Sequence, residues 1–287
     1  MSAAPGVRVG IHASVAGGVD KAVTNAVAAG CETFQLFVSN PRGWAERAAD
    51  PAADERFGKD LAPAGLGPVW VHAPYLVNFA SPSDDTRGRS AAVTAWTLRR
   101  AATLGASGVV VHAGSHMGAG RAAGLARTRA AVLPLLEEGD GPALLLELTA
   151  GAPNHMAARF EAMAELLAGL GDHPRLGVCF DTCHAHAAGY DLGTAAGAAA
   201  VDQLLAAVGD RVPLVHANDS RDAAGSGRDR HQAVGEGTIG EAGFAAVLAH
   251  PGLAGAAFVS ETSGDLEAQK ADVARLKALR PTPGPRR

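Results

Sequence analysis

Short apolar runs alternate along the chain with longer segments in which Ala and Leu recur at helical spacing. Eight runs rich in Val, Leu, Ile and Phe predict strands at residues 7–12, 33–37, 68–72, 108–112, 143–147, 176–181, 212–216 and 257–261. Segments between them predict helices, among them residues 90–104, 124–136, 155–168 and 195–208. Strands that alternate with helices in this way are typical of a parallel sheet covered by helices.

Eight such repeats within 287 residues favour one closed (β/α)₈ TIM barrel. An open, doubly wound sheet is the alternative, but that fold usually carries a Gly-rich phosphate turn after its first strand. Residues 10–18 do not have the GxGxxG pattern. We therefore expect a single barrel domain over residues 1–280, followed by a disordered basic tail at 281–287.

Metal-binding residue types stand at the ends of six predicted strands: His72, His112, Glu147, Asp181, His216 and Glu261. The other two strands end on His12 and Phe37. Because the carboxyl ends of barrel strands face one common site, residues far apart in sequence should converge there. Each residue alone could simply begin a loop, but six together predict an active site at this face.

Three further candidates are expected in loops beyond the strand ends. His184 follows Asp181 by three residues, and Asp229 and His231 lie in a long Gly-, Asp- and Arg-rich loop at residues 219–239. Imidazoles combined with carboxylates suit Zn²⁺ or Mn²⁺, and nine ligands exceed what one ion needs. The sequence thus predicts a site for two or three ions.

A series of motifs runs along nearly the whole chain in a fixed order. They are Gly10-Ile11-His12-Ala13-Ser14 with Gly17-Gly18, Phe34-Gln35-Leu36-Phe37 with Asn40-Pro41-Arg42 and Trp44, Val71-His72-Ala73-Pro74-Tyr75-Leu76-Val77-Asn78, His112-Ala113-Gly114-Ser115-His116, Glu147 with Thr149-Ala150-Gly151, Phe180-Asp181-Thr182-Cys183-His184 with Ala187-Ala188-Gly189-Tyr190-Asp191, His216-Ala217-Asn218-Asp219-Ser220, and Asp229-Arg230-His231 with Gly235-Glu236-Gly237. In these motifs the chain resembles the endonuclease IV family, the zinc-dependent apurinic/apyrimidinic endonucleases.

The resemblance implies three zinc ions per chain, with Mn²⁺ possible at one site. His72 and His112 would bind the first ion, and Glu147 would bridge it to the second. The second set would be completed by Asp181, His216 and Glu261, and the third would comprise His184, Asp229 and His231. Glu147 and Glu261 would also be catalytic, because they would position a hydroxide that attacks a DNA phosphodiester.

The resemblance also implies a double-stranded DNA substrate, cut on the 5′ side of abasic sites in base excision repair. It leaves open whether 3′-end cleaning accompanies this activity. Arg42, Tyr75 and Leu76 would enter the duplex at the lesion, and Arg230 would contact phosphate. Arg228 is a further candidate for phosphate contact. Without the resemblance, Tyr75 and Leu76 would be interpreted as packing on the barrel rim.

Four positions depart from the family pattern. Leu148, Ser263, His186 and Gln232 stand where Asn, Pro, an aromatic residue and Glu are usual. None of them removes a predicted ligand, although Leu148 and Gln232 could alter the groups that orient the ligands. His12 and His116 are expected to line the pocket, and Cys179 and Cys183 to pack.

Composition changes this picture little. The net charge of −4 shows no basic excess, but a carboxylate-rich site becomes less acidic once it holds cations. Three cysteines without a CxxC pair, no signal peptide and no long apolar run favour a cytoplasmic protein without membrane contact, expected to be a monomer. The functional alternative is a sugar isomerase or epimerase on the same barrel type, with one or two divalent ions.

Overall fold

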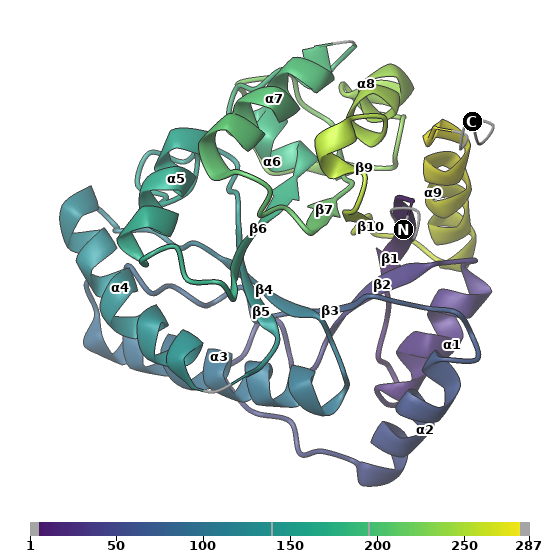
Figure 1. Cartoon of the computed structure of the whole chain (residues 1–287), viewed down its shortest axis with the longest axis horizontal. Helices are drawn as coiled ribbons and strands as arrows, with labels where there is room; N and C mark the ends of the chain where they lie inside the picture. Colours follow the sequence, from purple (N-terminus) through teal and green to yellow (C-terminus); the bar gives the residue numbers. More distant parts are fainter. Residues whose placement is uncertain (1–5, 139, 195, 282–287) are drawn as a thin grey trace.

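The computed structural model of the chain describes residues 6–138, 140–194 and 196–281. Eight parallel strands form a closed barrel in the order β1-β10-β7-β6-β5-β4-β3-β2 (Figure 1). They are β1 Arg8–His12, β2 Thr33–Phe37, β3 Val69–His72, β4 Gly108–His112, β5 Ala143–Glu147, β6 Leu176–Asp181, β7 Leu214–His216 and β10 Ala257–Ser260. The expected TIM barrel is confirmed.

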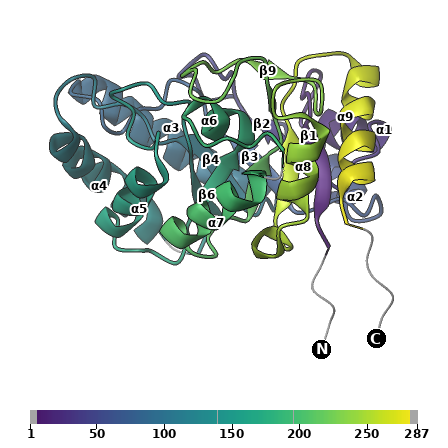
Figure 2. The same ribbon diagram turned by 90° about the horizontal axis from the view of Figure 1, so that it is seen from above.

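Helices surround the strands on the outside of the barrel (Figure 1). They are α1 Asp20–Ala28, α2 Pro51–Leu61, α3 Asp84–Thr103, α4 Arg121–Glu137, α5 Phe160–Gly169, α6 Thr182–Ala187, α7 Ala196–Val208, α8 Gly240–Leu248 and α9 Leu266–Leu279, with a 3₁₀ turn at Pro251–Leu253. Several begin at side-chain caps; for example, Asp50 and Ser83 accept backbone N–H groups at the starts of α2 and α3. Seen from the side, the ring is a shallow cylinder with α6 and β9 near one edge (Figure 2).

A small apolar cluster fills the inside of the barrel: Trp70, Val110, Leu145, Cys179, Leu214, Ala257 and Val259. Side chains two residues apart on a strand point to the same side. His72, His112, Glu147, Asp181, His216 and Glu261 each follow one member of this cluster by two residues. Because side chains alternate along each strand, all six polar side chains point into the barrel mouth, next to the apolar cluster inside the barrel.

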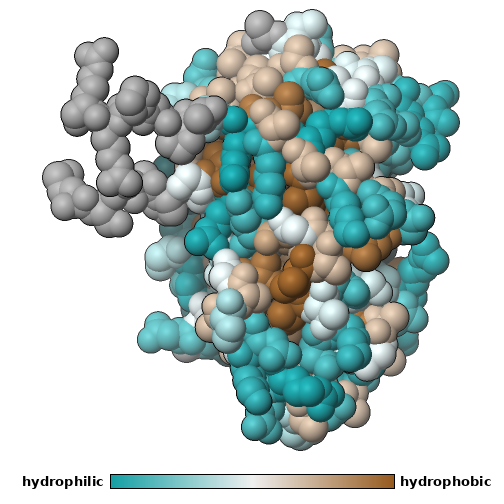
Figure 3. Space-filling model, turned by 90° about the vertical axis from the view of Figure 1, so that its right-hand side faces the viewer, coloured by the Kyte–Doolittle hydropathy of each residue, from teal (hydrophilic) through white to brown (hydrophobic). Residues whose placement is uncertain are grey.

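The larger core lies between the strands and the helices. Its bulkiest members are fully buried phenylalanines, such as Phe34 on β2, Phe57 on α2 and Phe160 on α5. Outside this layer, the face that carries α8 and α9 mixes hydrophilic side chains with small apolar patches (Figure 3). The apolar side chains are thus divided between the barrel interior and the strand–helix layer, as expected for a TIM barrel.

Some predicted boundaries are wrong. α3 begins at Asp84 rather than residue 90, because Ser83 caps it and two acidic residues occupy its first turn. α5 begins at Phe160 rather than residue 155, because residues 155–159 form turns and His155 makes an isolated bridge to Ser115. Residue 195, the predicted start of α7, lies outside the described residues.

The strand limits differ by one or two residues. β7 begins at Leu214 rather than residue 212, and β10 ends at Ser260, one residue before Glu261. The Glu261 N–H does not pair with a neighbouring strand, because it donates to Asn218 Oδ1 (2.8 Å). The predicted long loop also contains a short antiparallel ladder, β8 Asp219–Ser220 with β9 His231–Gln232.

The helices of the described residues include none with the length and apolar character needed to cross a bilayer. Residues 282–287 lie outside the described residues, so the disordered tail at 281–287 and the domain limit at residue 280 stay predictions.

Candidate metal centre

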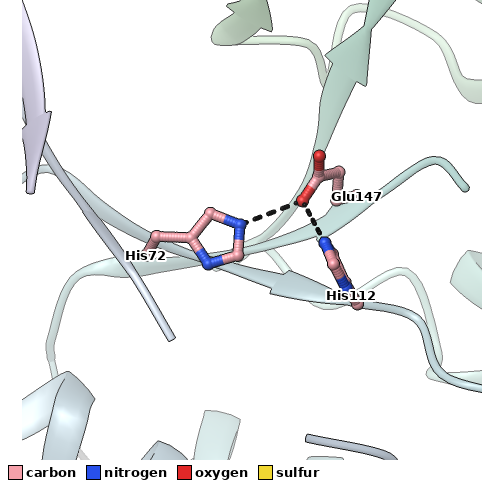
Figure 4. A group of neighbouring side chains, drawn as sticks. All are labelled: His72, His112 and Glu147. Atoms are coloured by element: carbon pink, nitrogen blue, oxygen red, sulfur yellow. Dashed lines mark hydrogen bonds and ion pairs between the residues drawn. The ribbon is translucent and has the colours of Figure 1, made fainter. Parts of the chain in front are cut away.

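The first group of candidate ligands lies at the ends of three adjacent strands. His72 ends β3, His112 ends β4 and Glu147 ends β5. Both histidines approach the same carboxylate oxygen, with Nε2 to Glu147 Oε2 distances of 3.1 Å for His72 and 3.2 Å for His112 (Figure 4). The three side chains could hold one metal ion, as expected for the first set.

The second group continues around the mouth and shares Glu147. Its ligand atoms come from Glu147, Asp181, His216 and Glu261 and lie within 4.8 Å of one another. His216 Nδ1 lies 3.0 Å from Glu147 Oε1 and 3.1 Å from Glu261 Oε2. Because Glu147 presents one oxygen to each group, it can bridge two ions.

The third group combines a helix with the long loop. Asp229 Oδ2 lies 3.2 Å from His184 Nε2, and Asp229 Oδ1 lies 3.1 Å from His231 Nε2. The prediction that His184 lies in a loop is wrong, since it belongs to α6. Asp181 caps this helix by accepting the His184 N–H (2.7 Å), so the second group fixes the backbone of the third.

The electrostatics of these groups favour cations. Burial by itself raises the pKa of the Glu147 carboxyl, but His216 and His112 lower it well below its usual range. Burial raises the pKa of Asp181 above its usual value. Burial would lower the pKa of His184, yet the charge of Asp181 and contact with Asp229 raise it to about 10. The carboxylates are thus ionised only beside positive charge, which protons on the histidines or bound metal ions can supply.

The donor set fits bound metal ions. Every residue of the predicted ligand set is an imidazole or a carboxylate, the combination that suits Zn²⁺ or Mn²⁺. His72 Nδ1 donates to Ala73 O (2.6 Å) and His184 Nδ1 donates to Leu148 O (2.8 Å). With Nδ1 used as a donor, Nε2 is the nitrogen that faces Glu147 or Asp229, and it can bind a metal ion once the ion displaces any proton there.

Sequence reasoning missed the residues that hold the ligands in place. Asn218 Nδ2 donates to Asp181 Oδ2 (2.8 Å) and Glu261 Oε2 (3.1 Å), while its Oδ1 accepts the Glu261 N–H. Gln35 contacts His216 and Glu261 from β2. Both residues belong to motifs visible in the sequence, but only their spacing relative to strand ends could have suggested an inward position.

The cysteines and His12 have different surroundings. Cys179 packs in the barrel interior, as expected. Cys183 Sγ, which we expected only to pack, lies within 4.8 Å of ligand atoms of Asp229 and His231. Burial raises the pKa of Cys183 to about 12, so its thiol stays protonated in the metal-free chain. His12 lines the pocket, as expected, with Nδ1 3.4 Å from Glu261 Oε1.

Exposed apolar side chains lie at the rim beside the first group. Tyr75 is 46% exposed and stacks on His112 with 5.7 Å between ring centroids, and neighbouring Leu76 is 39% exposed. Met117, which the sequence did not single out, is 62% exposed with its sulfur 3.9 Å from Ser81 Oγ in the same rim. Arg42 is exposed, and its loop joins the rim because Tyr75 N donates to Pro41 O.

Two arginines of the long loop contact the same carboxylate. Arg230 Nε donates to Asp222 Oδ2 (2.6 Å), and Arg228 Nη1 lies 3.5 Å from Asp222 Oδ1. Arg230 is still half exposed. Its guanidinium is therefore oriented by Asp222.

The four departures from the family pattern leave the ligand groups intact. The Leu148 side chain is buried, and its backbone carbonyl orients His184 whatever the side chain. Gln232 Oε1 accepts from Arg221 Nε (3.1 Å). His186 Nδ1 accepts the Leu192 N–H, while its Nε2 lies 3.2 Å from Thr238 Oγ1. Ser263 is exposed.

Comparison with known proteins gives the same family as the motifs. The model of the family described as "Xylose isomerase-like TIM barrel" matches residues 23–279. The chain is 45% identical over 289 residues to "Probable endonuclease 4" of Streptomyces coelicolor, covering 97% of each chain. It is 41% identical to "Probable endonuclease 4" of Methanoculleus marisnigri over 95% of this chain and 99% of that protein. The chain belongs to the endonuclease IV family. It is thus an endonuclease IV-type enzyme of DNA repair, as the sequence predicted.

Solved structures separate this family from others on the same barrel. The crystal structure of endonuclease IV from Thermus thermophilus matches with a TM-score of 0.84 and 39% identity, over 95% of this chain and 98% of that one. A D-tagatose 3-epimerase-like protein matches with a TM-score of 0.73 at 20% identity, which shows the fold alone. The isomerase alternative therefore has only the barrel in its favour.

Proposed function

We propose that this member of the endonuclease IV family hydrolyses the DNA phosphodiester on the 5′ side of abasic sites, using three zinc ions. The observation that carries the proposal is a series of adjoining ligand groups around the mouth. Glu147 belongs to the first two groups, and Asp181 of the second also lies within 4.8 Å of ligand atoms of His184 and His231. An isomerase with one or two ions would not need the third group, which Asp229 joins at 3.1–3.2 Å to two histidines. Mn²⁺ could replace zinc at one of the three sites.

Bound zinc ions supply a nucleophile at neutral pH and stabilise charge on the attacking and leaving oxygens. The protein residues determine where this chemistry can occur. Glu147 uses both of its oxygens to join the first two ligand groups, and Glu261 faces the same space from the end of β10. These two carboxylates would orient the attacking water toward phosphorus. The apolar cluster inside the barrel would disfavour movement of this water away from them.

The DNA duplex would bind across the mouth of the barrel. Tyr75 and Leu76 would enter it at the lesion, with Arg42 beside them on the neighbouring loop. An abasic nucleotide leaves the helix easily because no base must be unstacked. Arg230, oriented by Asp222, would contact a backbone phosphate on the other side of the mouth.

The test is cleavage of a duplex that carries one abasic-site analogue, alongside the same duplex with an intact base. We expect incision on the 5′ side of the lesion, loss of incision after chelation, and recovery when zinc is added back. Metal analysis by mass spectrometry should find about three zinc ions per chain. Absence of incision at every metal loading would refute the activity, and a single Mg²⁺ or Mn²⁺ per chain would favour the isomerase.

The proposal also covers the oligomeric state of the enzyme and the cellular compartment in which it works. The chain would act as a monomer on double-stranded DNA in the cytoplasm. Its three cysteines are free thiols, as is usual in a reducing compartment.

A further inference from the structure

Gln35 is a fully buried amide on β2 that reaches three polar groups across the barrel mouth. Its Nε2 lies 2.8 Å from Glu261 Oε1 and 2.9 Å from His12 Nδ1, and its Oε1 lies 3.0 Å from His216 Nε2. Both N–H groups of the amide and its carbonyl oxygen therefore have partners.

The partners fix which way the amide points. An ionised carboxylate only accepts hydrogen bonds, so the Gln35 NH₂ group must face Glu261. The amide oxygen then faces His216, and an oxygen can only accept there. His216 must consequently carry a hydrogen on Nε2, so Nδ1, which faces Glu147 and Glu261, is the nitrogen that can bind a metal ion.

Two other ligand histidines are oriented by backbone carbonyls and not by a side chain. His72 and His184 donate to the backbone carbonyls of Ala73 and Leu148, which no substitution removes. His216, which is fully buried, depends instead on a side chain. Its orientation can therefore be changed by replacing a single residue.

We propose that Gln35 is a positioning residue of the second ligand group, which holds His216 in the tautomer that presents Nδ1 to a metal ion and anchors the Glu261 carboxylate. The inference rests on the proposed metal centre and goes beyond it, because it assigns a role to a residue outside the ligand set. Groups that orient metal ligands typically change metal affinity by ~10–100-fold when they are removed.

The main variant is Gln35→Met, which keeps the length of the side chain and removes its hydrogen bonds. Thr33→Val is the matched control, because Thr33 is equally buried on the same strand and its hydroxyl donates to Pro68 O, away from the ligands. Zinc-loaded proteins are titrated with a competing chelator, and the zinc retained per chain is measured. We expect one of the ions to leave Gln35→Met at a chelator concentration ~10–100-fold lower than in the unmodified protein, and Thr33→Val to match the unmodified protein.

Spectra of the zinc-loaded proteins with ¹⁵N-labelled histidine provide a readout that mere loss of packing would not produce. The hydrogen-bonded Nε2–H of His216 should exchange slowly with solvent in the unmodified protein and in Thr33→Val, but rapidly in Gln35→Met. If Gln35→Met fails to fold, Gln35→Asn keeps the amide but is too short to reach both partners, and the same changes are expected. Unchanged zinc retention and unchanged exchange in a folded variant would overturn the proposal. Neither measurement uses DNA, so a failed cleavage assay would count against the proposed activity and not against this role.

Discussion

At the scale of single residues, the candidate metal centre depends on carboxylates that each contact several neighbouring side chains. Glu147 offers Oε2 to His72 and His112 and Oε1 to His216. Glu261 offers Oε2 to His216 and Oε1 to Gln35. Because each oxygen has its own neighbours, replacing a carboxylate by its amide changes charge and donor pattern while it keeps the shape.

Glu261→Gln is expected to lower the turnover of an abasic-site duplex by ~10²-fold or more while most of the metal stays bound, because the neutral amide can no longer orient the attacking water. Initial rates at saturating zinc and the zinc content of the same samples would measure this. Glu267→Gln on the exposed start of α9 is the control. Unchanged turnover in Glu261→Gln would refute the catalytic role.

Leu76→Ala is expected to weaken binding of the abasic-site duplex by roughly 10-fold, or about 1.4 kcal/mol, because a wedge into the duplex would be lost. The zinc content should stay the same, since Leu76 is absent from the ligand groups. Val27→Ala is the matched control, because Val27 is 53% exposed and lies on α1. Equal dissociation constants for the two variants, measured by fluorescence anisotropy, would count against insertion.

At the scale of elements, one buried carboxylate closes the loop that carries Asp229 and His231. Asp219 accepts backbone N–H groups from Ser220 at the start of this loop and from Gly237, Ile239 and Gly240 at its end. Gly237 is needed there, since a Cβ would lie 2.5 Å from Asp219 Oδ1. The ends of the loop are thus held together while its centre reaches over the mouth.

Asp219→Asn should lower the free energy of unfolding by ~1.5–3 kcal/mol, because an amide NH₂ would face N–H donors that now have a charged acceptor. Hydrogen exchange should accelerate over residues 219–240, and the zinc held by the third group should leave more readily. Asp210→Asn, at an exposed position after α7, is the control. The prediction would be wrong if urea unfolding and hydrogen exchange of Asp219→Asn both matched those of the control.

At the scale of the whole molecule, the closed barrel brings ligands from five strands and the intervening segments to one mouth. Ions bound there would be held by residues of β3, β4, β5, β6, β7 and by the residue after β10. Since unfolded chains cannot assemble this site, bound metal stabilises the fold by mass action.

Removal of the metal ions with a chelator should therefore lower the melting temperature by roughly 10–15 °C, which corresponds to about 8 kcal/mol for three ions that each contribute ~2.7 kcal/mol at free zinc 100-fold above its Kd. Scanning calorimetry with and without chelator measures the change, and addition of excess zinc should reverse it. The control is the same chelator added together with an equal amount of zinc. An unchanged melting temperature would show that the site makes no net contribution to stability.

The hydrophobic pattern predicted the barrel because each strand carries its own local signal. Apolar runs of about five residues identified all eight barrel strands, and the strand ends identified six of the nine candidate ligands. Helix starts were harder, since the start of α3 depends on the Ser83 cap and that of α5 on a bridge from His155 to Ser115. Such contacts have no periodic signature.

The parallel barrel, the residue types at its mouth and the family could all be predicted from the amino-acid sequence, because they depend on local periodicity and on motif order along the chain. The contacts between ligand groups became visible only in the folded chain. Glu147 places one oxygen in each of two groups, and Asp181 caps the helix that carries His184. It also gave Gln35 its partners on distant strands. These contacts depend on the closure of the ring and on side-chain directions in space, which spacing along the chain does not specify.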